Sequence, residues 1–481
     1  MTGVRTRFAP SPTGYMHIGN LRTALYAYLH ARKNKGKFIL RIEDTDQTRL
    51  VEDSIRVIYD SLAVTGLEYD EGPDKGGPVG PYVQSERRPI YREHAEKLLN
   101  EGSAYRCFCN KDGNSEKQPT DDPADPILGY DGRCRKLSAA ETQEKLAKGL
   151  PYVIRQKIDK EGRTIFNDFV YGEITVDHKQ LDDQILLKSD GYPTYNFANV
   201  VDDHLMGITH VMRGCEYISS TPKYILLYRA FGWEIPEHIH LPHILNESGR
   251  KLSKREGSVA LSSFLEKGYL PEAILNYIAL LGWNPGTEEE FFSKEGLIEK
   301  FDIARIGKAP SIFDEKKLLW LNSRHIKARK PEEIHELFLK FYPDAIVNKF
   351  DVKQITGLIQ GRVEKMSDIP QMVSFLMELD ENYSKELFVN KKNKTTLEGS
   401  LAVLKDLESL LSGIASWNYD GIYGAVNSYA EAKGVKIGAI MWPLRVAISG
   451  LTVTPGGAVE IAELLGKSES IRRISLAIRK L

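Results

Sequence analysis

The feature that most limits the fold is a short turn, rich in proline and glycine, between an apolar run and a helical pattern. The segment APSPTG places Pro10, Pro12 and Gly14 where neither a strand nor a helix can continue. Residues 4–9 predict a short strand before the turn, and apolar residues at helical spacing from Leu21 predict a helix after it. A strand, a tight turn and a helix in this order are typical of an α/β domain.

The same turn has the chemistry of an anion-binding site. A helix N-terminus carries unpaired N–H groups and a partial positive charge, which favour phosphate. Gly19 allows a bulky group to approach the backbone closely, and His17 can donate a hydrogen bond to a phosphate oxygen. The alternative interpretation is an ordinary strand-to-helix turn whose histidine is merely exposed.

Acidic residues follow the next strand-like segment. Residues 37–41 (KFILR) predict a strand, and Glu43, Asp44 and Asp46 come directly after it. Ligands of open α/β sheets bind at the carboxyl ends of the strands, so these acids are expected at the ligand edge.

The order of segments predicts two halves of different architecture. A chain of 481 residues is too long for one core and predicts about three or four domains. Strand-like and helical segments alternate as far as about Phe313, and only helical patterns follow. The polar stretch at residues 111–131 predicts an insertion or an exposed hairpin. We therefore expect an α/β N-terminal half with an insertion, followed by an all-α C-terminal half.

Composition restricts the partners and the compartment. The net charge of −1 means that any nucleic acid is bound through local basic patches, without a global positive field. No apolar run approaches the ~18 residues of a membrane span, and no secretory or transit peptide is expected ahead of Arg7. The four cysteines do not suggest a disulfide framework, which favours a cytoplasmic location.

A basic loop bounded by glycines is a second candidate for polyphosphate binding. In GRKLSKREG, residues 249–257, Lys251 and Lys254 are three positions apart with Ser253 between them. Two ammonium groups on a flexible loop can close over a polyphosphate and neutralise charge that develops at the α-phosphate. The alternatives are a solvated basic loop and a nuclear localisation signal.

Taken together, these segments resemble the bacterial-type glutamyl-tRNA synthetases, which are class I aminoacyl-tRNA synthetases. The segment APSPTGYMHIGN resembles the first class I signature, and KLSKR resembles the second. Other segments match the family along nearly the whole chain: RIEDTD, EGPD, YVQSER, KSDGYPTYNFANVVDDHLMGITHV and STPKYILLYRAFGW. Two departures are Asn20, where the first signature ends in histidine, and Arg255, where the second ends in serine.

The resemblance implies both a domain plan and a reaction. It implies a Rossmann-type catalytic domain at 1–84 and 197–245, an acceptor-end insertion at 85–196, a stem-contact region at 246–325 and a helical anticodon-binding region at 326–481. It implies a cytoplasmic monomer that uses ATP and Mg²⁺ to convert L-glutamate to glutamyl-adenylate, and then acylates the 3′-terminal adenosine of tRNA-Glu. No protein residue is acylated, so positioning and electrostatics carry the catalysis.

The resemblance also implies roles for individual residues. Arg7 and Arg213 are expected to bind the carboxylates of glutamate, because guanidinium binds carboxylate in a bidentate manner. Glu43 is expected to meet the substrate ammonium group. Tyr195 and Asn199, four positions apart, are expected to line the same pocket, although core packing is an alternative for Tyr195. The remaining expected residues are Ala9 and Ser11 for glutamate, His17, Gly19, Asn20 and Lys254 for ATP, and His17, Lys251 and Lys254 for catalysis.

Three cysteines in the expected insertion suggest a zinc site. Cys107, Cys109 and Cys134 have the spacing C-x-C…C, and a structural zinc site needs four ligands. The resemblance implies a histidine two positions after the third cysteine, but Lys136 stands there. The fourth ligand is then the phenolic oxygen of Tyr130 or a water. The alternative is a decayed site with three remaining thiols.

The helical half offers one candidate for base recognition. Arg362 lies roughly where the family has an anticodon-reading arginine, and arginine pairs well with base edges. A solvated helix arginine is the alternative. Three rival functions remain open: a small-molecule adenylyltransferase, a glutaminyl or relaxed enzyme that also charges tRNA-Gln, and a non-catalytic tRNA-binding protein. The long helical half argues against the first, and the combination of His17, Glu43 and the two lysines argues against the third.

Overall fold

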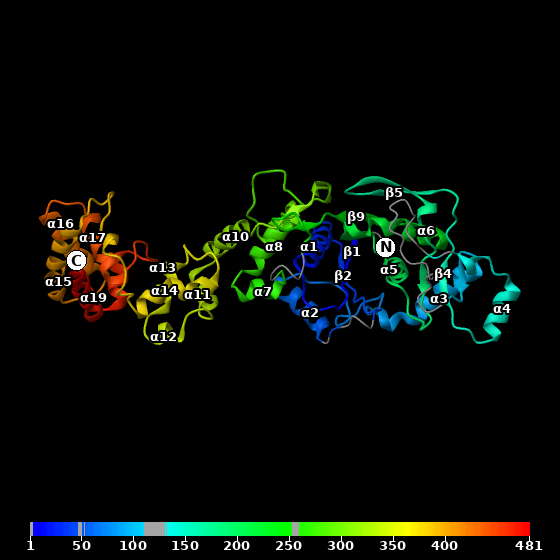
Figure 1. Ribbon diagram of the computed structural model, residues 1–481, viewed down its shortest axis with the longest axis horizontal. Coiled ribbons are helices and arrows are strands. Elements are labelled where there is room, and N and C mark those ends of the chain that lie inside the picture. Colours follow the sequence, from blue (N-terminus) through cyan, green and yellow to red (C-terminus); the bar gives the residue numbers. More distant parts are fainter. Residues whose placement is uncertain (1–2, 47–50, 52, 110–129, 131, 253–258) are drawn as a thin grey trace. The chain divides into compact units, whose positions relative to one another are not determined.

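The computed structural model describes residues 3–46, 51, 53–109, 130, 132–252 and 259–481. It divides the chain into two compact units. The first unit comprises Met1–Leu265 and Pro271–Glu315, and the second comprises Glu266–Leu270 and Lys316–Leu481. Figure 1 labels many of the helices and strands along the chain.

The strands are short and lie in the first unit: β1 (Arg5–Phe8), β2 (Lys37–Leu40), β3 (Ala104–Cys107), β4 (Val153–Gln156), β5 (Arg163–Asp168), β6 (Gly172–Asp177), β7 (Ile185–Leu187), β8 (His210–Gly214), β9 (Glu237–Leu241), β10 (Ile244–Leu245) and β11 (Ser311–Ile312). The helices before residue 315 are α1 (Ile18–Lys33), α2 (Ser54–Thr65), α3 (Arg88–Asn100), α4 (Ala139–Ala147), α5 (Tyr195–Leu205), α6 (Thr221–Phe231), α7 (Leu261–Glu266), α8 (Pro271–Ala279) and α9 (Lys294–Lys300). The later helices are α10 (Glu315–Ala328), α11 (Pro331–Phe338), α12 (Asp344–Val347), α13 (Val352–Ile359), α14 (Ile369–Met377), α15 (Leu397–Ser412), α16 (Tyr419–Ala432), α17 (Gly438–Ser449), α18 (Ala458–Leu465) and α19 (Lys467–Lys480).

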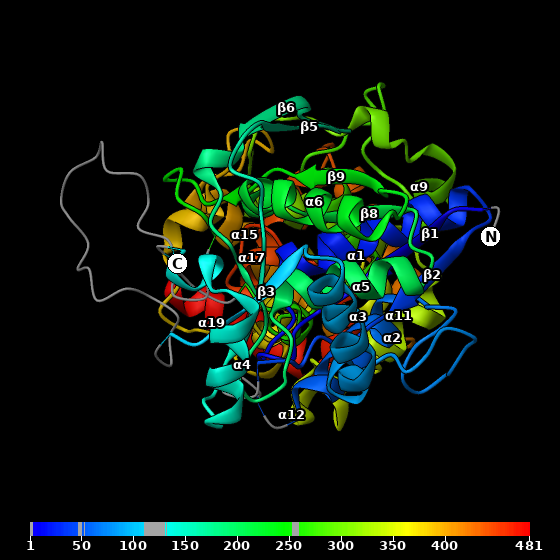
Figure 2. The same cartoon turned by 90° about the vertical axis from the view of Figure 1, so that its right-hand side faces the viewer.

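The main sheet has a strand order that creates a ligand edge. Its order is β2-β1-β8-β9-β5-β6, with the β5–β6 hairpin at one side (Figure 2). The pairs β1–β2, β1–β8, β8–β9 and β9–β5 are parallel, and β5–β6 is antiparallel. Strand β1 therefore lies between the next strand of the chain and a strand from much later. This reversal of strand order is a topological switch point, and ligands bind outside the carboxyl ends of strands there.

The two faces of this sheet have different environments. Successive side chains of a strand point to opposite faces. Thr6 faces α1 and donates its hydroxyl to the Ala27 carbonyl over 2.8 Å. Arg5 and Arg7 belong to the other face, where α5 supplies Asp203 and helices α3, α5 and α6 form an apolar core. The second face therefore carries buried charges beside a hydrophobic cluster.

A smaller sheet occupies part of the predicted insertion. Strands β3, β4 and β7 form an antiparallel sheet, and α4 lies between β3 and β4 in the sequence. The β5–β6 hairpin, also from this region, joins the main sheet through β9. Most of the polar stretch at 111–131 lies outside the described residues. The domain boundaries at 84, 196, 245 and 325 stay a prediction.

The second unit, whose residues are all described, contains helices and no strand. Arg473 of α19 is fully buried and donates to the carbonyls of Phe375, Leu376 and Ile448, so it ties α19 to α14 and α17. The expected fold class, an α/β half followed by an all-α half, is confirmed. Within the described residues, every helix lacks the combination of length and hydropathy that crossing a bilayer requires.

Candidate active site

A cavity of about 650 Å³ opens at the carboxyl ends of β1, β2, β8 and β9 in the first unit. Ten of the residues expected from the sequence line it: Arg7, Ala9, Ser11, His17, Gly19, Asn20, Glu43, Tyr195, Arg213 and Lys251. Lys254, the other expected lysine, lies outside the described residues. Residues from distant segments thus converge where the strand order predicts a ligand.

The proline-rich turn ends in a histidine cap. Helix α1 begins at Ile18, three residues before Leu21, because the Nδ1 atom of His17 accepts a hydrogen bond from the Gly19 amide over 3.0 Å. A Cβ at Gly19 would lie 3.3 Å from this Nδ1 atom, so glycine gives the cap room. Because Nδ1 accepts, the proton of the neutral ring is on Nε2. Any donation by His17 to a phosphate oxygen is therefore made through Nε2.

A buried ionic network supports two of the cavity residues. Arg7 binds both oxygens of Asp203, over 3.1 and 3.3 Å, and donates through Nη1 to the Met212 carbonyl over 3.0 Å. Arg41 lies 2.8 Å from Asp203 and 2.9 Å from Glu43. Buried charges are tolerated when they are paired in this way. Asp203 therefore neutralises Arg7, and Arg41 holds the Glu43 carboxylate.

Two carboxyl groups of the network titrate in opposite directions. Burial raises the pKa of Glu43, even though the Arg41 and Arg7 guanidiniums oppose this shift. Burial alone would also raise the pKa of Asp203, but Arg7 and Arg41 outweigh it and hold this pKa below its ordinary value. Asp203 is therefore the more firmly ionised member of the network.

Arg213 has a different environment from Arg7. Its Nε atom donates to Nε2 of His240, and its Nη2 atom donates to Thr221 Oγ1, each over 3.2 Å. Among the residues that the structure describes, no carboxylate lies within ion-pair distance of Arg213. Its guanidinium also lies 4.5 Å from the ring centre of Tyr224. Arg213 therefore presents an uncompensated positive charge to the cavity, whereas Arg7 is already neutralised.

Tyr195 and Asn199 have separate positions. Tyr195 lines the cavity, and its ring centre lies 5.3 Å from that of Tyr217, which lines it too. Asn199 is buried and donates its side-chain amide to the Tyr195 carbonyl over 2.7 Å. It is not one of the cavity-lining residues, so its direct contact with a substrate stays a prediction.

The sequence did not single out two further cavity residues, Glu216 and His243. They follow strands β8 and β9, a position that could have marked them as ligand-edge residues. Glu216 lies 3.4 Å from the ammonium group of Lys251, with both side chains about half exposed. Side-chain atoms of Glu216, His243 and Cys215 lie within 4.8 Å of one another.

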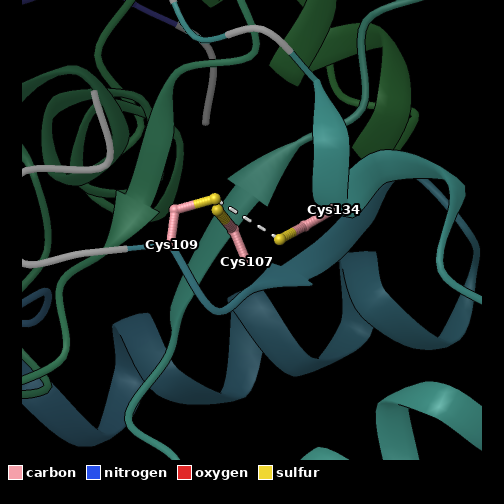
Figure 3. A group of neighbouring side chains, drawn as sticks. All are labelled: Cys107, Cys109 and Cys134. Carbon is pink, nitrogen blue, oxygen red and sulfur yellow. Dashed lines mark hydrogen bonds between the residues drawn. The ribbon is translucent and has the colours of Figure 1, made fainter. Parts of the chain in front are cut away.

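The three cysteines of the expected zinc site converge (Figure 3). The sulfur atoms of Cys107, Cys109 and Cys134 all lie within 4.8 Å of one another, and those of Cys109 and Cys134 are 3.5 Å apart. The Tyr130 hydroxyl accepts a hydrogen bond from the Cys134 amide over 2.8 Å and also bonds the Cys107 thiol. Lys136 is exposed. Three thiols and a phenol thus form a donor set of four.

The thiols of Cys107 and Cys109 differ in acidity, because the pKa of Cys107 is lowered and burial raises that of Cys109. Burial alone would also raise the pKa of Cys107, but hydrogen bonds from the Tyr130 hydroxyl and the Cys109 amide outweigh burial and hold this pKa below its ordinary value. Thiolate is the form that binds metal.

The second unit has a cavity of its own, of about 760 Å³. The exposed Arg362, which follows α13, lines it together with Gln371 and Ser374 of α14 and Ser449 of α17. The predicted anticodon arginine therefore faces a hollow with several hydrogen-bonding side chains.

Comparisons with known proteins cover the whole chain. Residues 3–320 match the family described as tRNA synthetases class I (E and Q), catalytic domain, and residues 333–478 match the anticodon binding domain. The glutamate–tRNA ligase of Clostridium tetani is 54% identical over 478 residues, which cover 99% of this chain and 98% of that protein. The glutamate–tRNA ligase of Clostridium acetobutylicum is 54% identical over 480 residues, 99% of each chain. The crystal structure of a glutamate tRNA ligase from Elizabethkingia meningosepticum, in complex with its amino acid, matches with a TM-score of 0.86 and 35% identity over 100% of both chains.

Proposed function

The chain belongs to the glutamate–tRNA ligase family of class I aminoacyl-tRNA synthetases, and from this premise we propose how its cavity works. It activates L-glutamate with ATP to glutamyl-adenylate and transfers the glutamyl group to the 3′-terminal adenosine of tRNA-Glu. The observation that carries the proposal is one cavity with an uncompensated arginine, a buried carboxylate and a helix N-terminus. These groups complement the carboxylate, the ammonium and the phosphates of the two substrates.

The glutamate half of the cavity is built around Arg213 and Glu43. The Arg213 guanidinium binds the side-chain carboxylate of glutamate, because no protein carboxylate in the described residues competes for it. Glu43, held by Arg41, binds the ammonium group. Arg7 contributes to glutamate binding through the N–H groups that do not bond Asp203 or Met212. The shape of the pocket is set by Ala9, Ser11, Tyr195 and Asn199.

The ATP half is built around the turn before α1. His17 donates to a phosphate oxygen through Nε2, while Gly19 and Asn20 at the start of α1 leave room for the nucleotide. Lys251 and Lys254 close over the polyphosphate, and Mg²⁺, which arrives with ATP, shares the phosphate charge. The Lys251 contact with Glu216 is partly exposed and easily exchanged for a phosphate contact.

The other regions bind tRNA. The insertion at 85–196 holds the acceptor end, the region at 246–325 contacts the stem, and the helices at 326–481 bind the anticodon, with Arg362 at a base edge. Cys107, Cys109 and Cys134 would hold Zn²⁺ with Tyr130 as the fourth donor, and the ion would stiffen the insertion. The enzyme works as a cytoplasmic monomer.

Aminoacylation of purified tRNA-Glu and tRNA-Gln transcripts, each with glutamate and with glutamine, tests the proposal. We expect glutamine to be rejected by at least about 10³ in kcat/KM, because its amide N–H groups would face the Arg213 donors. Arg213→Gln should weaken the use of glutamate far more than the binding of ATP. The matched control is Arg229→Gln, an exposed arginine outside the cavity. Comparable charging of glutamine by the native enzyme would overturn the substrate assignment.

A further inference from the structure

Arg213 differs from the other buried arginines on its side of the main sheet. Four of them, Arg5, Arg7, Arg41 and Arg87, each bind a carboxylate within 3.3 Å. Arg213 is equally buried, but it binds a histidine and a threonine. A buried guanidinium without a carboxylate costs stability, because its charge is not compensated. The partners of Arg213 therefore require an explanation.

The partner histidine is fixed in one tautomer by Asp168. The Nδ1 atom of His240 lies 2.6 Å from Oδ2 of Asp168, and both side chains are fully buried. The other oxygen of Asp168 accepts from the amides of Val170 and Tyr171, over 3.0 and 2.8 Å. Because an ionised carboxylate only accepts, Nδ1 of His240 must carry the proton. Nε2 then keeps its lone pair and accepts from Nε of Arg213.

Thr221 is fixed in a similar way. Its hydroxyl donates to the Tyr217 carbonyl over 2.9 Å, which leaves its lone pairs for Nη2 of Arg213. One edge of the guanidinium is therefore held by two neutral acceptors, His240 Nε2 and Thr221 Oγ1, which lie 3.3 Å from each other. Nη1, which makes no hydrogen bond within the described residues, is left for the cavity that Arg213 lines.

Neutral acceptors orient a cation without neutralising it. We propose that Asp168 and His240 are positioning residues for glutamate recognition, and that they hold Arg213 toward the cavity while its full charge remains available for the substrate carboxylate. This inference rests on the proposed role of Arg213. Burial lowers the pKa of His240, and the nearby Arg213 adds to this effect against the opposing bond to Asp168, so the ring stays neutral.

The arrangement also links two distant parts of the chain. Asp168 is the last residue of β5, His240 belongs to β9, and the two strands pair in parallel at Asp168 and His238. The β5–β6 hairpin thus reaches the glutamate pocket through one imidazole ring. A shift of the hairpin would therefore change the orientation of Arg213 through His240, without direct contact between the hairpin and Arg213.

Asp168→Asn is the sharpest test, because it keeps the shape and reverses the tautomer. The asparagine amide donates to Nδ1, which moves the imidazole proton to Nε2, where it faces the Nε–H of Arg213. Loss of a charge-assisted hydrogen bond should raise the KM for glutamate by roughly 10- to 100-fold. The KM for ATP should change by less than about twofold, and the preference for glutamate over glutamine should fall with the glutamate KM.

His240→Gln provides the rescue. The amide oxygen of glutamine can take the place of Nε2 and accept from Arg213, whatever residue stands at position 168. We expect the double variant to bind glutamate no more weakly than His240→Gln alone, and better than Asp168→Asn alone. Independent contributions of the two residues would instead make the two losses add.

A spectroscopic readout is independent of activity. In protein labelled with ¹⁵N-histidine, the His240 signals, identified by their loss in His240→Gln, should report a proton on Nδ1 in the wild type. They should report a proton on Nε2 in Asp168→Asn. His335→Gln is the matched control, since His335 is a buried histidine of the second unit that bonds Thr356. It should leave the glutamate KM unchanged.

The outcomes separate this inference from the proposed function. If Arg213→Gln leaves the glutamate KM unchanged, the assigned role of Arg213 is wrong. If Arg213→Gln raises that KM but Asp168→Asn does not, or if the imidazole proton stays on Nδ1 in Asp168→Asn, only the positioning role is overturned. A loss in the double variant that equals the sum of the single losses also contradicts it.

Discussion

Arg7 of β1 binds both carboxylate oxygens of Asp203 from α5, over 3.1 and 3.3 Å, with both side chains buried. The same carboxylate accepts from Arg41 of the loop after β2 over 2.8 Å. One carboxylate therefore pairs with two guanidiniums and joins two strand ends to a helix. This arrangement holds Arg7 and Glu43 of the glutamate half in place, because Asp203 binds Arg7 and Arg41 binds Glu43.

Asp203→Asn should destabilise the protein strongly. Removing one partner of a buried ion pair typically costs about 3–5 kcal/mol, since the remaining charges stay buried without compensation. Urea unfolding of the full chain measures the loss. Asp60→Asn, at an exposed helix position, is the control and should stay within about 0.5 kcal/mol of the wild type. A loss for Asp203→Asn as small as that of the control would mean that the pair is not a stabilising element.

The turn before α1 could be predicted from neighbouring residues, whereas pairs of residues far apart in the sequence could not. Two prolines and a glycine mark the turn before α1, and proximity in sequence was enough to place His17 at its end. Its role as the helix cap, which moves the start of α1 to Ile18, needed the backbone geometry. Arg7 and Asp203 are 196 positions apart in the sequence, and the sequence near either residue gives no sign that the two pair. The same holds for Asp168, His240 and Arg213.

The cysteine spacing predicted only part of the expected zinc site. It predicted that three thiols would meet, and they do. It left the fourth donor open between Tyr130 and a water, because a phenol at this distance in sequence has no fixed direction. The packing of Tyr130 against Cys107 and Cys134 supports the phenol.

The cysteine cluster predicts a bound zinc ion. Protein purified without chelator should contain close to one zinc per chain, because three thiols and a phenol supply the four donors of a structural site. Elemental analysis measures it. Cys134→Ser should lose the metal, and Tyr130→Phe should bind it more weakly.

The matched control for this site is Cys215→Ser, which changes a cysteine outside the cluster and should keep the zinc. Lys136→His should raise the affinity, since it offers an imidazole where lysine is a poor ligand while protonated. Less than about a tenth of one zinc per chain in the wild type would remove the site from consideration.

Lys254→Ala should slow the chemical step by roughly 10²–10³-fold, the range for losing one preorganised charge donor. Single-turnover formation of glutamyl-adenylate and filter binding of tRNA separate chemistry from affinity. Binding of tRNA should change little, because most phosphate contacts lie elsewhere. Arg250→Ala removes a neighbouring positive charge and serves as the control. Near wild-type charging by Lys254→Ala would show that this lysine is not catalytic.

Glu469 gives the second unit a specific dependence on pH. It binds Arg472 through both oxygens over 2.8 Å and the buried Arg473 over 2.7 Å. These hydrogen bonds, first that of Arg472, lower the pKa of Glu469 from 4.5 to about 2. A pKa that is depressed in the folded state stabilises the fold above the unfolded value, and this stabilisation is lost as the pH falls from about 4.5 toward 2.

Glu469→Gln should therefore loosen α19 at pH 7 by about 1 kcal/mol, the upper end for partly exposed pairs, because Arg473 keeps only its carbonyl partners. Hydrogen exchange of the α19 amides in the full chain, compared between variant and wild type at each pH, measures the difference. It should shrink as the pH falls from about 4.5 toward 2, because the wild-type carboxylate protonates over this range, first in the unfolded helix, and the glutamine cannot. Glu336→Gln, an exposed change on α11, should show no such trend. A difference that stays constant with pH would mean that Glu469 acts through packing and not through its charge.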